Sequence, residues 1–205
     1  MRTIFEQFSA GMDNIYNSFY LSFLSLKVLG ERPLSNDYYI PISGFSFNHL
    51  EAERINSIQM DSVNEYVNAI RRHLLNDIVI CYERYATTMY ASFCNGMIRT
   101  DPAKIDDRGN NPSKFEKIEG LYTKEEKEFF VQLRHLRNSI VHYNGVYSKT
   151  NPLNYTFYKN YYNSDGHEGE PISVELDSLM YILTRTRSMV ERINKVFFEQ
   201  GLENR

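Results

Sequence analysis

Apolar residues recur with helical spacing along most of this 205-residue chain. Near the N-terminus they are separated by steps of four, four and three residues, which places them on one face of a helix. This first set is Ile15, Phe19, Phe23 and Leu26. We expect a helix over 3–29 that stops at Gly30, because glycine ends helices readily and Pro33 follows shortly afterwards.

A longer apolar pattern with the same spacing runs from Val63 to Phe93. Ser62, followed by Glu65 three residues later, matches a capping box, in which each side chain bonds the other residue's backbone at the start of a helix. A start further upstream is the alternative. The pattern predicts either one long helix or two helices joined by a kink. Residues 99–122 combine Pro, Gly and mixed charges, so we expect a surface loop with one short turn of helix.

Thr123 and Glu126 form a second capping-box pair and predict a helix from there to about Tyr143. Gly145 fits the left-handed backbone position that ends many helices. Residues 146–174 are then expected to form an insertion, with a turn at 163–166 and a small β-hairpin over 154–174.

The last apolar pattern predicts a helix over 176–200. Its inward stripe is expected to hold Leu179, Leu183, Val190, Ile193 and Phe197. These elements together predict an all-α fold, a helical bundle in one domain over 1–205 with a small β-hairpin before the last helix.

Composition limits the classes of function. The net charge is −3, so any contact with nucleic acid must come from a local cluster of Arg and His and not from an overall positive field. Cys81 and Cys94 are the only cysteines, too few for a zinc site, and we expect reduced core thiols. We find no signal-peptide pattern and no apolar run of membrane-spanning length, so the expected location is the cytoplasm, without membrane attachment.

The helix over 123–143 is expected to have two different apolar sides. Phe129, Leu133, Leu136 and Ile140 fall within one narrow arc, which should face the core of the chain. A separate set of Phe130, Arg137 and Val141 lies outside that arc. Because an exposed helix has little reason to keep apolar residues there, we expect this second side to pack against another copy of the chain.

Arg137, Asn138 and His142 near the end of this helix have the side chains needed to cleave RNA without a metal. Arginine holds a phosphate through its planar fork of donors, and histidine moves protons near neutral pH. Arg137 and His142 are five residues apart, hence about 140° apart around a helix. The side chains of Arg137 and His142 in one copy therefore converge poorly, and we expect dimerisation to assemble the site from two copies.

The Arg-Asn-x-x-x-His sequence at 137–142, near the end of the penultimate helix, resembles the signature of the HEPN superfamily (higher eukaryotes and prokaryotes nucleotide-binding domain). The specific part of the resemblance covers 125–145. It implies a helical-bundle homodimer with a composite site, often a metal-independent endoribonuclease of toxin, abortive-infection or other defence systems. Some relatives carry Tyr two positions after the His, where this chain has Asn144.

The implied mechanism uses the 2′-hydroxyl of RNA as the nucleophile, with no metal and no cofactor. His142 would accept the 2′-hydroxyl proton or protonate the leaving 5′-oxygen. Arg137 would bind the scissile phosphate, and Asn138 would orient the imidazole or the phosphate. Arg134 and His135 are candidates for substrate binding. The expected partners are RNA, a second copy of the chain and a cognate antitoxin or regulatory protein.

Several alternatives stay open at the level of sequence. Arg137 could be a surface residue paired with Glu126 or another carboxylate, and His142 could only cap the helix end. The chain could also be a non-catalytic dimeric module that binds RNA or a protein, or a purely structural dimerisation domain. The tyrosines Tyr155, Tyr158, Tyr161 and Tyr162 could stack bases or be ordinary strand residues.

Overall fold

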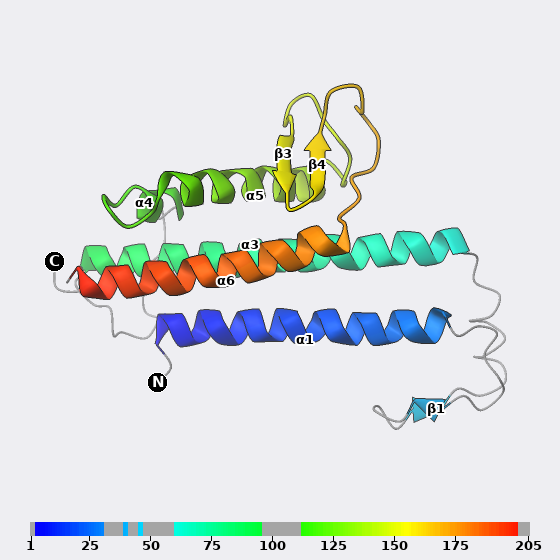
Figure 1. Ribbon diagram of the computed structural model, residues 1–205, viewed down its shortest axis with the longest axis horizontal. Coiled ribbons are helices and arrows are strands. Elements are labelled where there is room, and N and C mark those ends of the chain that lie inside the picture. Colours follow the sequence, from blue (N-terminus) through cyan, green and yellow to red (C-terminus); the bar gives the residue numbers. More distant parts are fainter. Residues whose placement is uncertain (1–2, 31–38, 41–44, 47–59, 96–111, 201–205) are drawn as a thin grey trace. The chain divides into compact units, whose positions relative to one another are not determined.

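The computed structural model describes residues 3–30, 39–40, 45–46, 60–95 and 112–200, and its described part is mostly helical (Figure 1). The helices are α1 (Ile4–Gly30), α3 (Met60–Asn95), α4 (Pro112–Glu116), α5 (Lys124–His142) and α6 (Leu176–Glu199). Two antiparallel strand pairs join β1 (Tyr39–Ile40) to β2 (Phe45–Ser46) and β3 (Asn154–Phe157) to β4 (Asn160–Asn163). The expected mostly-α class is confirmed.

The chain divides into two compact units. The first consists of Met1–Tyr16 and Arg71–Arg205, and so contains the start of α1, most of α3, and α4 to α6. The second consists of Asn17–Ile70 and contains the β1–β2 pair. All the candidate site residues belong to the first unit.

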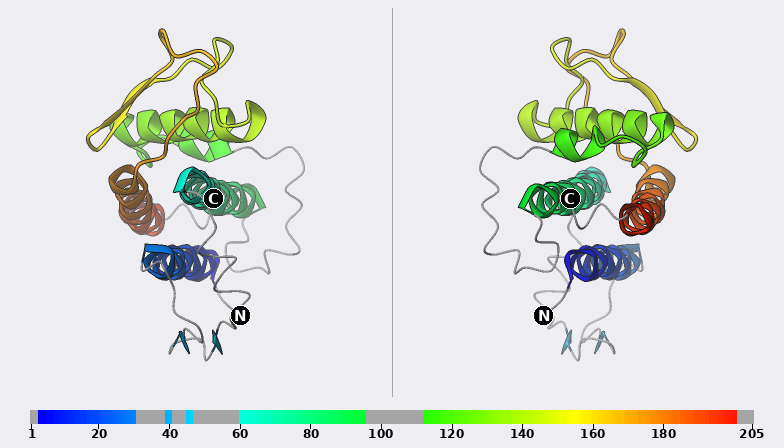
Figure 2. Two further views of the ribbon diagram at one scale, coloured as in Figure 1. Left: turned by 90° about the vertical axis from the view of Figure 1, so that its right-hand side faces the viewer. Right: turned by 90° about the vertical axis from the view of Figure 1, so that its left-hand side faces the viewer.

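In the first unit, α3 and α6 lie side by side as a layer between α5 and the start of α1 (Figures 1 and 2). Phe8 of α1 contacts Tyr85 of α3 and so joins two layers, and Phe93 of α3 contacts Phe197 of α6 within the middle layer. The inward stripe expected for the last helix is confirmed, because Leu179, Leu183, Val190, Ile193 and Phe197 are all buried. Burial of such a stripe is the main source of stability for an amphipathic helix.

The expected N-terminal helix is confirmed as α1, and the long second pattern forms the single helix α3. Of the two starts considered for this helix, the capping box at Ser62 is wrong and the start further upstream is confirmed, because Ser62 already lies inside α3, which includes Met60. Residues three apart also lie one above the other within a helix, so Ser followed by Glu at this spacing is not unique to a helix start.

The stretch expected as a surface loop, 99–122, is described only from residue 112 onwards. There Pro112–Glu116 forms α4, with proline at the first helical position where its missing N–H is harmless. This confirms the short helical turn. The described part is exposed at Lys114, Lys117, Glu119 and Gly120, but it is more than a surface loop, because Phe115 and Leu121 are fully buried. Phe115 packs edge-on against Tyr85 and Tyr122, which ties this segment to the core.

The expected hairpin is present but shorter than 154–174: it ends at Asn163, with β3 and β4 paired from Asn154↔Asn163 to Phe157↔Asn160. The turn expected at 163–166 follows the hairpin, where the His167 N–H donates to the Ser164 carbonyl oxygen at 3.2 Å. Two hydrogen bonds fix the hairpin between helices. Asn151 Nδ2 donates to Ser139 Oγ of α5 at 2.6 Å, and Ser178 Oγ of α6 donates to the Phe157 carbonyl oxygen at 2.9 Å.

Both cysteines are free thiols, and their burial differs. Cys81 is partly buried, whereas Cys94 is exposed, so the expected core position is wrong for Cys94. Within the described ranges, none of the helices is both long enough and apolar enough to cross a membrane.

Candidate functional site

Helix α5 begins and ends as the sequence predicts. Thr123 Oγ1 accepts from the Glu126 N–H at 3.2 Å, and the Thr123 N–H donates to Glu126 Oε2 at 2.9 Å, which confirms the capping box. At the other end, Gly145 has φ of 69°, and its N–H donates to the Ser139 carbonyl oxygen at 3.1 Å. Asn144 shares the left-handed backbone with φ of 56°, so two residues together turn the chain away from the helix.

The buried face of α5 is wider than the sequence predicts. Phe129, Leu133 and Leu136 are buried as expected, whereas Ile140 is only partly buried. Phe130 is also 0% exposed and stacks on Tyr82 of α3 with ring centroids 3.7 Å apart. The expectation that Phe130 lies on a face between two copies is therefore wrong. Phe130 is buried within the chain because α5 packs on two sides, with Phe130 toward α3 and Phe129 toward Phe157 of the hairpin.

Arg137 is half-buried and is held by two amide oxygens. Its Nε donates to Asn76 Oδ1 of α3 at 3.1 Å, and its Nη1 donates to Asn138 Oδ1 at 3.2 Å. Both acceptors are neutral, so they fix the orientation of the guanidinium without neutralising its charge. The structure thus uses Asn138 to position Arg137, whereas the sequence suggested the imidazole or the phosphate as its target.

His142 is exposed in the last turn of α5. The side chain of Arg137 is directed toward α3, and five residues of helix rotate His142 by about 140° from it. Within the described residues, no hydrogen bond links the two side chains. Within one chain, Arg137 and His142 therefore do not point toward a common phosphate position. The sequence predicted this divergence from their spacing of five residues.

Arg134 differs from Arg137 because a buried carboxylate neutralises it. Its Nη1 and Nη2 donate to Glu116 Oε1 and Oε2 at 2.5 and 2.9 Å, and Tyr82 Oη donates to the same carboxylate at 2.6 Å. Burial lowers the pKa of Arg134, but the hydrogen bond and charge of Glu116 outweigh burial and raise the pKa above its ordinary value. A phosphate would have to compete with Glu116, so substrate binding by Arg134 stays a prediction.

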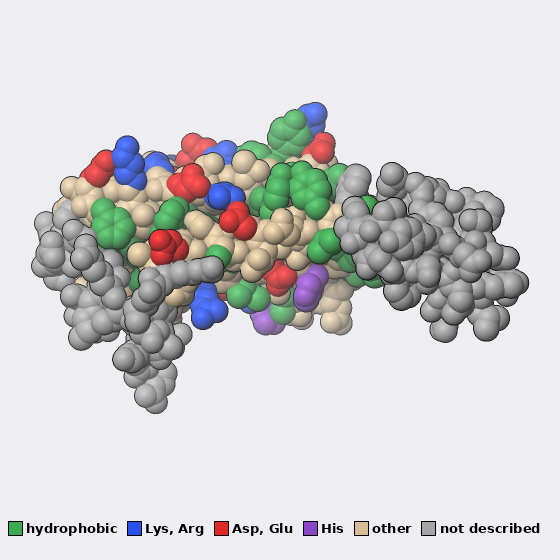
Figure 3. All heavy atoms as spheres, turned by 90° about the horizontal axis from the view of Figure 1, so that it is seen from below, with side chains coloured by type: hydrophobic (Ala, Val, Ile, Leu, Met, Phe, Trp, Pro, Cys, Tyr) green, Lys and Arg blue, Asp and Glu red, His purple; other side chains and the backbone are tan. Residues whose placement is uncertain are grey.

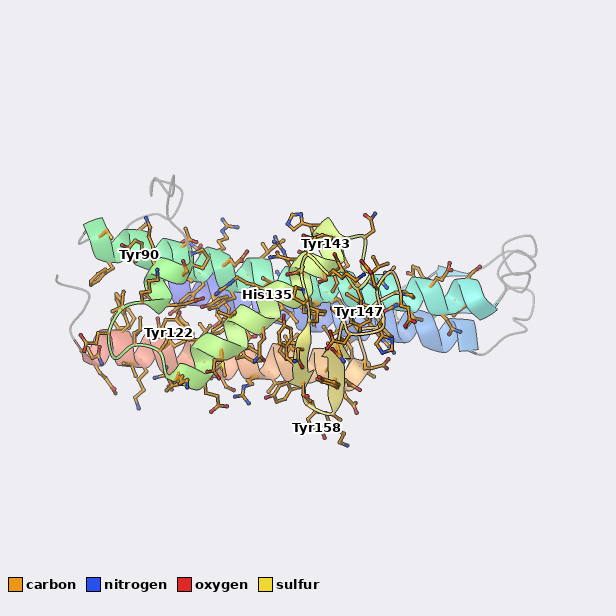
Figure 4. The ribbon with its side chains drawn as sticks, turned by 90° about the horizontal axis from the view of Figure 1, so that it is seen from above. Tyr90, Tyr122, His135, Tyr143, Tyr147 and Tyr158 are labelled. Atoms are coloured by element: carbon orange, nitrogen blue, oxygen red, sulfur yellow. The ribbon has the colours of Figure 1, made fainter. Side chains whose placement is uncertain are left out.

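His135 lies on the exposed side of α5, beside the hairpin (Figure 4). Its ring meets Tyr155 edge-on, with centroids 6.3 Å apart. Burial raises the pKa of Tyr155 to about 12, so this phenol stays neutral at physiological pH. Contact of His135 with substrate also stays a prediction.

Two residues of α3 belong to the site and were not identified from the sequence. Asn76 holds Arg137, and Arg72, one turn earlier, donates from Nε and Nη2 to the Ile172 carbonyl oxygen at 3.0 and 2.6 Å. Arg72 Nη1 lies 2.7 Å from the place where a side chain at Gly145 would begin. Burial lowers the pKa of Arg72. Their spacing of four was visible in the sequence, but nothing showed which helix they face.

Arg137 and Arg72 differ from other arginines of the first unit because the acceptors of their hydrogen bonds are neutral. Besides Arg134, other arginines of the unit pair with carboxylates: Arg71 with Glu175, Arg185 with Glu125, Arg187 with Asp13 and Arg192 with Glu126. The last pair makes the alternative of an Arg137–Glu126 pair wrong. Figure 3 shows acidic and basic side chains interspersed over the described part of one face, as the net charge of −3 suggests. The described acceptors of Arg137 on α5 and Arg72 on α3 are instead neutral oxygens of side-chain amides and of the backbone.

A groove of about 440 Å³ lies elsewhere in the first unit, between the start of α1 and α3. Cys81, Asp77 and Arg84 are among the residues lining it, and the candidate residues of α5 are not. Among the residues that the structure describes, no group of three or more His, Cys, Asp or Glu side chains is arranged to hold a metal ion. Comparisons with protein-family models, with curated proteins and with solved structures found no match for the chain.

Proposed function

We propose that this chain is a metal-independent endoribonuclease that cuts RNA by attack of the substrate's own 2′-hydroxyl. The observation that carries the proposal is the state of Arg137. Its guanidinium is oriented by the amide oxygens of Asn76 and Asn138 and keeps its full charge for a phosphate. The resemblance of 137–142 to the HEPN signature supports the same assignment.

Each residue has a chemical task in this proposal. The 2′-oxygen attacks phosphorus and the bond from phosphorus to the 5′-oxygen breaks, which yields a 2′,3′-cyclic phosphate and a 5′-hydroxyl. One imidazole of His142 accepts the 2′-hydroxyl proton, and the leaving 5′-oxygen takes its proton from water or from the second His142. Arg137 binds the phosphate oxygens through two parallel donors and stabilises the negative charge of the transition state.

A second copy of the chain completes the site in this proposal, because Arg137 and His142 diverge within one chain. Phe130 is buried and contributes nothing to the contact between copies. The contact instead uses the C-terminal turn of α5, where Val141 is 43% exposed one turn beyond Arg137. A role in toxin or defence systems and a cognate antitoxin or regulatory protein complete the proposal, and they rest on the family resemblance alone. The proposed cytoplasmic location rests on the lack of a signal-peptide pattern in this sequence.

The test is cleavage of a labelled RNA oligonucleotide in the presence of EDTA. We expect the chain to cut it, and Arg137→Ala and His142→Ala to lose about 10²–10⁴-fold in rate, the usual contribution of such groups. Matched controls are Arg187→Ala and His167→Ala, which remove exposed ion-paired residues of the same types. A 2′-deoxy nucleotide at the cleaved position should block the reaction.

Full activity in both α5 variants would remove these residues from the site. RNA that is bound through Arg137 but recovered whole would favour the non-catalytic binding module, since the same neutral partners also suit a site that only binds phosphate.

A further inference from the structure

The tip of the β3–β4 hairpin carries an aromatic residue in an unfavourable backbone conformation. Tyr158 has φ of 59°, in the left-handed region that Gly, Asn and Asp tolerate and that is uncommon for bulky residues. Its ring is 51% exposed, so burial in the core does not compensate for this strain. Such strain at an exposed position points to a function for the side chain.

The surroundings of Tyr158 resemble a stacking surface with cations beside it. Its ring lies 5.9 Å from that of Tyr181 of α6 at an interplanar angle of 30°. Lys159 Nζ lies 4.9 Å from the Tyr158 ring centroid. The Arg185 guanidinium lies 5.3 Å from the Tyr181 ring centroid, but it is paired with Glu125, so Lys159 supplies the cation for a phosphate. We call Tyr158, Lys159, Tyr181 and Arg185 the hairpin-tip platform. Figure 4 shows Tyr158 at the outer end of the hairpin, away from α5.

The hairpin holds this platform in a fixed position relative to α5. Asn160 Nδ2 donates to Ser178 Oγ at 2.8 Å, and Ser178 in turn donates to the Phe157 carbonyl oxygen, so both strands are tied to α6 next to the tip. Asn151 ties the entry of the hairpin to α5. A strand of RNA bound at the tip would therefore meet a rigid second contact on the unit that carries Arg137.

We infer that the hairpin-tip platform binds single-stranded RNA by stacking a base on Tyr158, with Lys159 near the backbone phosphate. Exposed aromatic rings with neighbouring cations are what proteins use to bind single strands without reading sequence. Of the two residues that flank the tip, Asn160 is polar and Phe157 is buried, so no apolar side chain next to Tyr158 on the hairpin is left exposed for a protein interface. The choice of RNA over DNA rests on the proposed function.

The experiment measures binding separately from cleavage. The probe is a fluorescein-labelled 2′-O-methyl oligouridine of twelve nucleotides, which cannot be cut through a 2′-hydroxyl, and the readout is fluorescence anisotropy. Tyr158→Asn removes the ring and suits the left-handed backbone, so the Tm should stay at or above that of the unmodified chain. We expect it to weaken binding by about 5- to 100-fold, the usual contribution of one stacked base.

Three further variants test the mechanism of binding. Tyr158→Phe keeps the ring and should bind like the unmodified chain. Lys159→Gln should weaken binding and reduce its dependence on salt. Phe198→Ala, which removes an exposed ring near the end of α6, should leave binding unchanged.

The outcomes separate the two proposals. Unchanged affinity of a folded Tyr158→Asn variant, or no binding of the probe by the unmodified chain, overturns the platform even if RNA is cleaved. Binding that depends on Tyr158 in a chain that cuts no RNA supports the platform and overturns the ribonuclease.

Discussion

Arg134 and Arg137 are three residues apart on α5 and have opposite electrostatic surroundings. Arg134 is locked to the buried carboxylate of Glu116, so its charge serves the fold. Arg137 meets only amide oxygens among its described partners, so its charge is left for a ligand. The sequence could identify both arginines, but it could not show this difference, because Glu116 and Asn76 come from other helices.

This difference predicts separate effects on stability. Arg134→Ala leaves Glu116 buried and unpaired, and should lower the free energy of unfolding by about 3–5 kcal/mol. Arg137→Ala removes two hydrogen bonds to neutral groups and should lower it by about 1 kcal/mol. Urea denaturation measures both. An equal or larger loss in Arg137→Ala would show that Arg137 is a structural residue.

The two thiols should differ in reactivity. Burial raises the pKa of Cys81 from 9.0 to about 11. The charge of Arg84 lowers this pKa and the charge of Asp77 raises it, and both effects are smaller than that of burial. In Cys94→Ser, Cys81 should therefore react slowly with a disulfide reagent at pH 8 and faster as the pH approaches 11. Because the folded chain holds this proton more tightly, its contribution to stability is full below pH 9 and is lost as the pH rises toward 11. A fast reaction at pH 8 would contradict the burial of this thiol.

At the scale of elements, the sequence predicted well what is set by local chemistry. The capping box at Thr123 and the left-handed Gly145 depend on a few neighbouring residues, and both were found. The sequence did not predict that Phe130 and Phe115 are buried, because their burial depends on contacts with helices distant in the chain. For the same reason the sequence predicted Arg137 as a site residue but not Asn76 or Arg72.

The end of α5 gives a test of one such distant contact. Gly145→Ala puts a side chain on a left-handed backbone and against Arg72 Nη1, 2.7 Å from its Cβ. Gly166→Ala is the matched control, since Gly166 has φ of 80° but no atom within 4 Å of the added Cβ. We expect Gly166→Ala to lower the free energy of unfolding by about 1 kcal/mol, and Gly145→Ala by about 2–3 kcal/mol.

A double variant separates the two causes. Arg72→Ala should relieve part of the loss in Gly145→Ala, so the two effects should not add. Equal losses at Gly145 and Gly166, or full additivity with Arg72→Ala, would show that Arg72 does not pack against the turn after His142.

For the whole molecule, the net charge of −3 and the interspersed charges leave RNA binding to local groups (Figure 3). Arg137 is directed toward α3 and His142 lies at the exposed end of α5. The proposed ribonuclease therefore needs a second copy for both residues to act on one phosphate. Activity should consequently rise more steeply than in proportion to protein concentration where the copies dissociate.

The most direct measurement is complementation between two inactive variants. Arg137→Ala and His142→Ala, coexpressed with different tags and purified as a mixed complex, should regain part of the RNA cleavage in EDTA that each variant alone has lost. The mixed pair retains one arginine and one histidine on different copies, which is what the proposed site needs. Failure to isolate a mixed complex, or an inactive one under conditions where the unmodified chain cuts RNA, would contradict a site shared between copies.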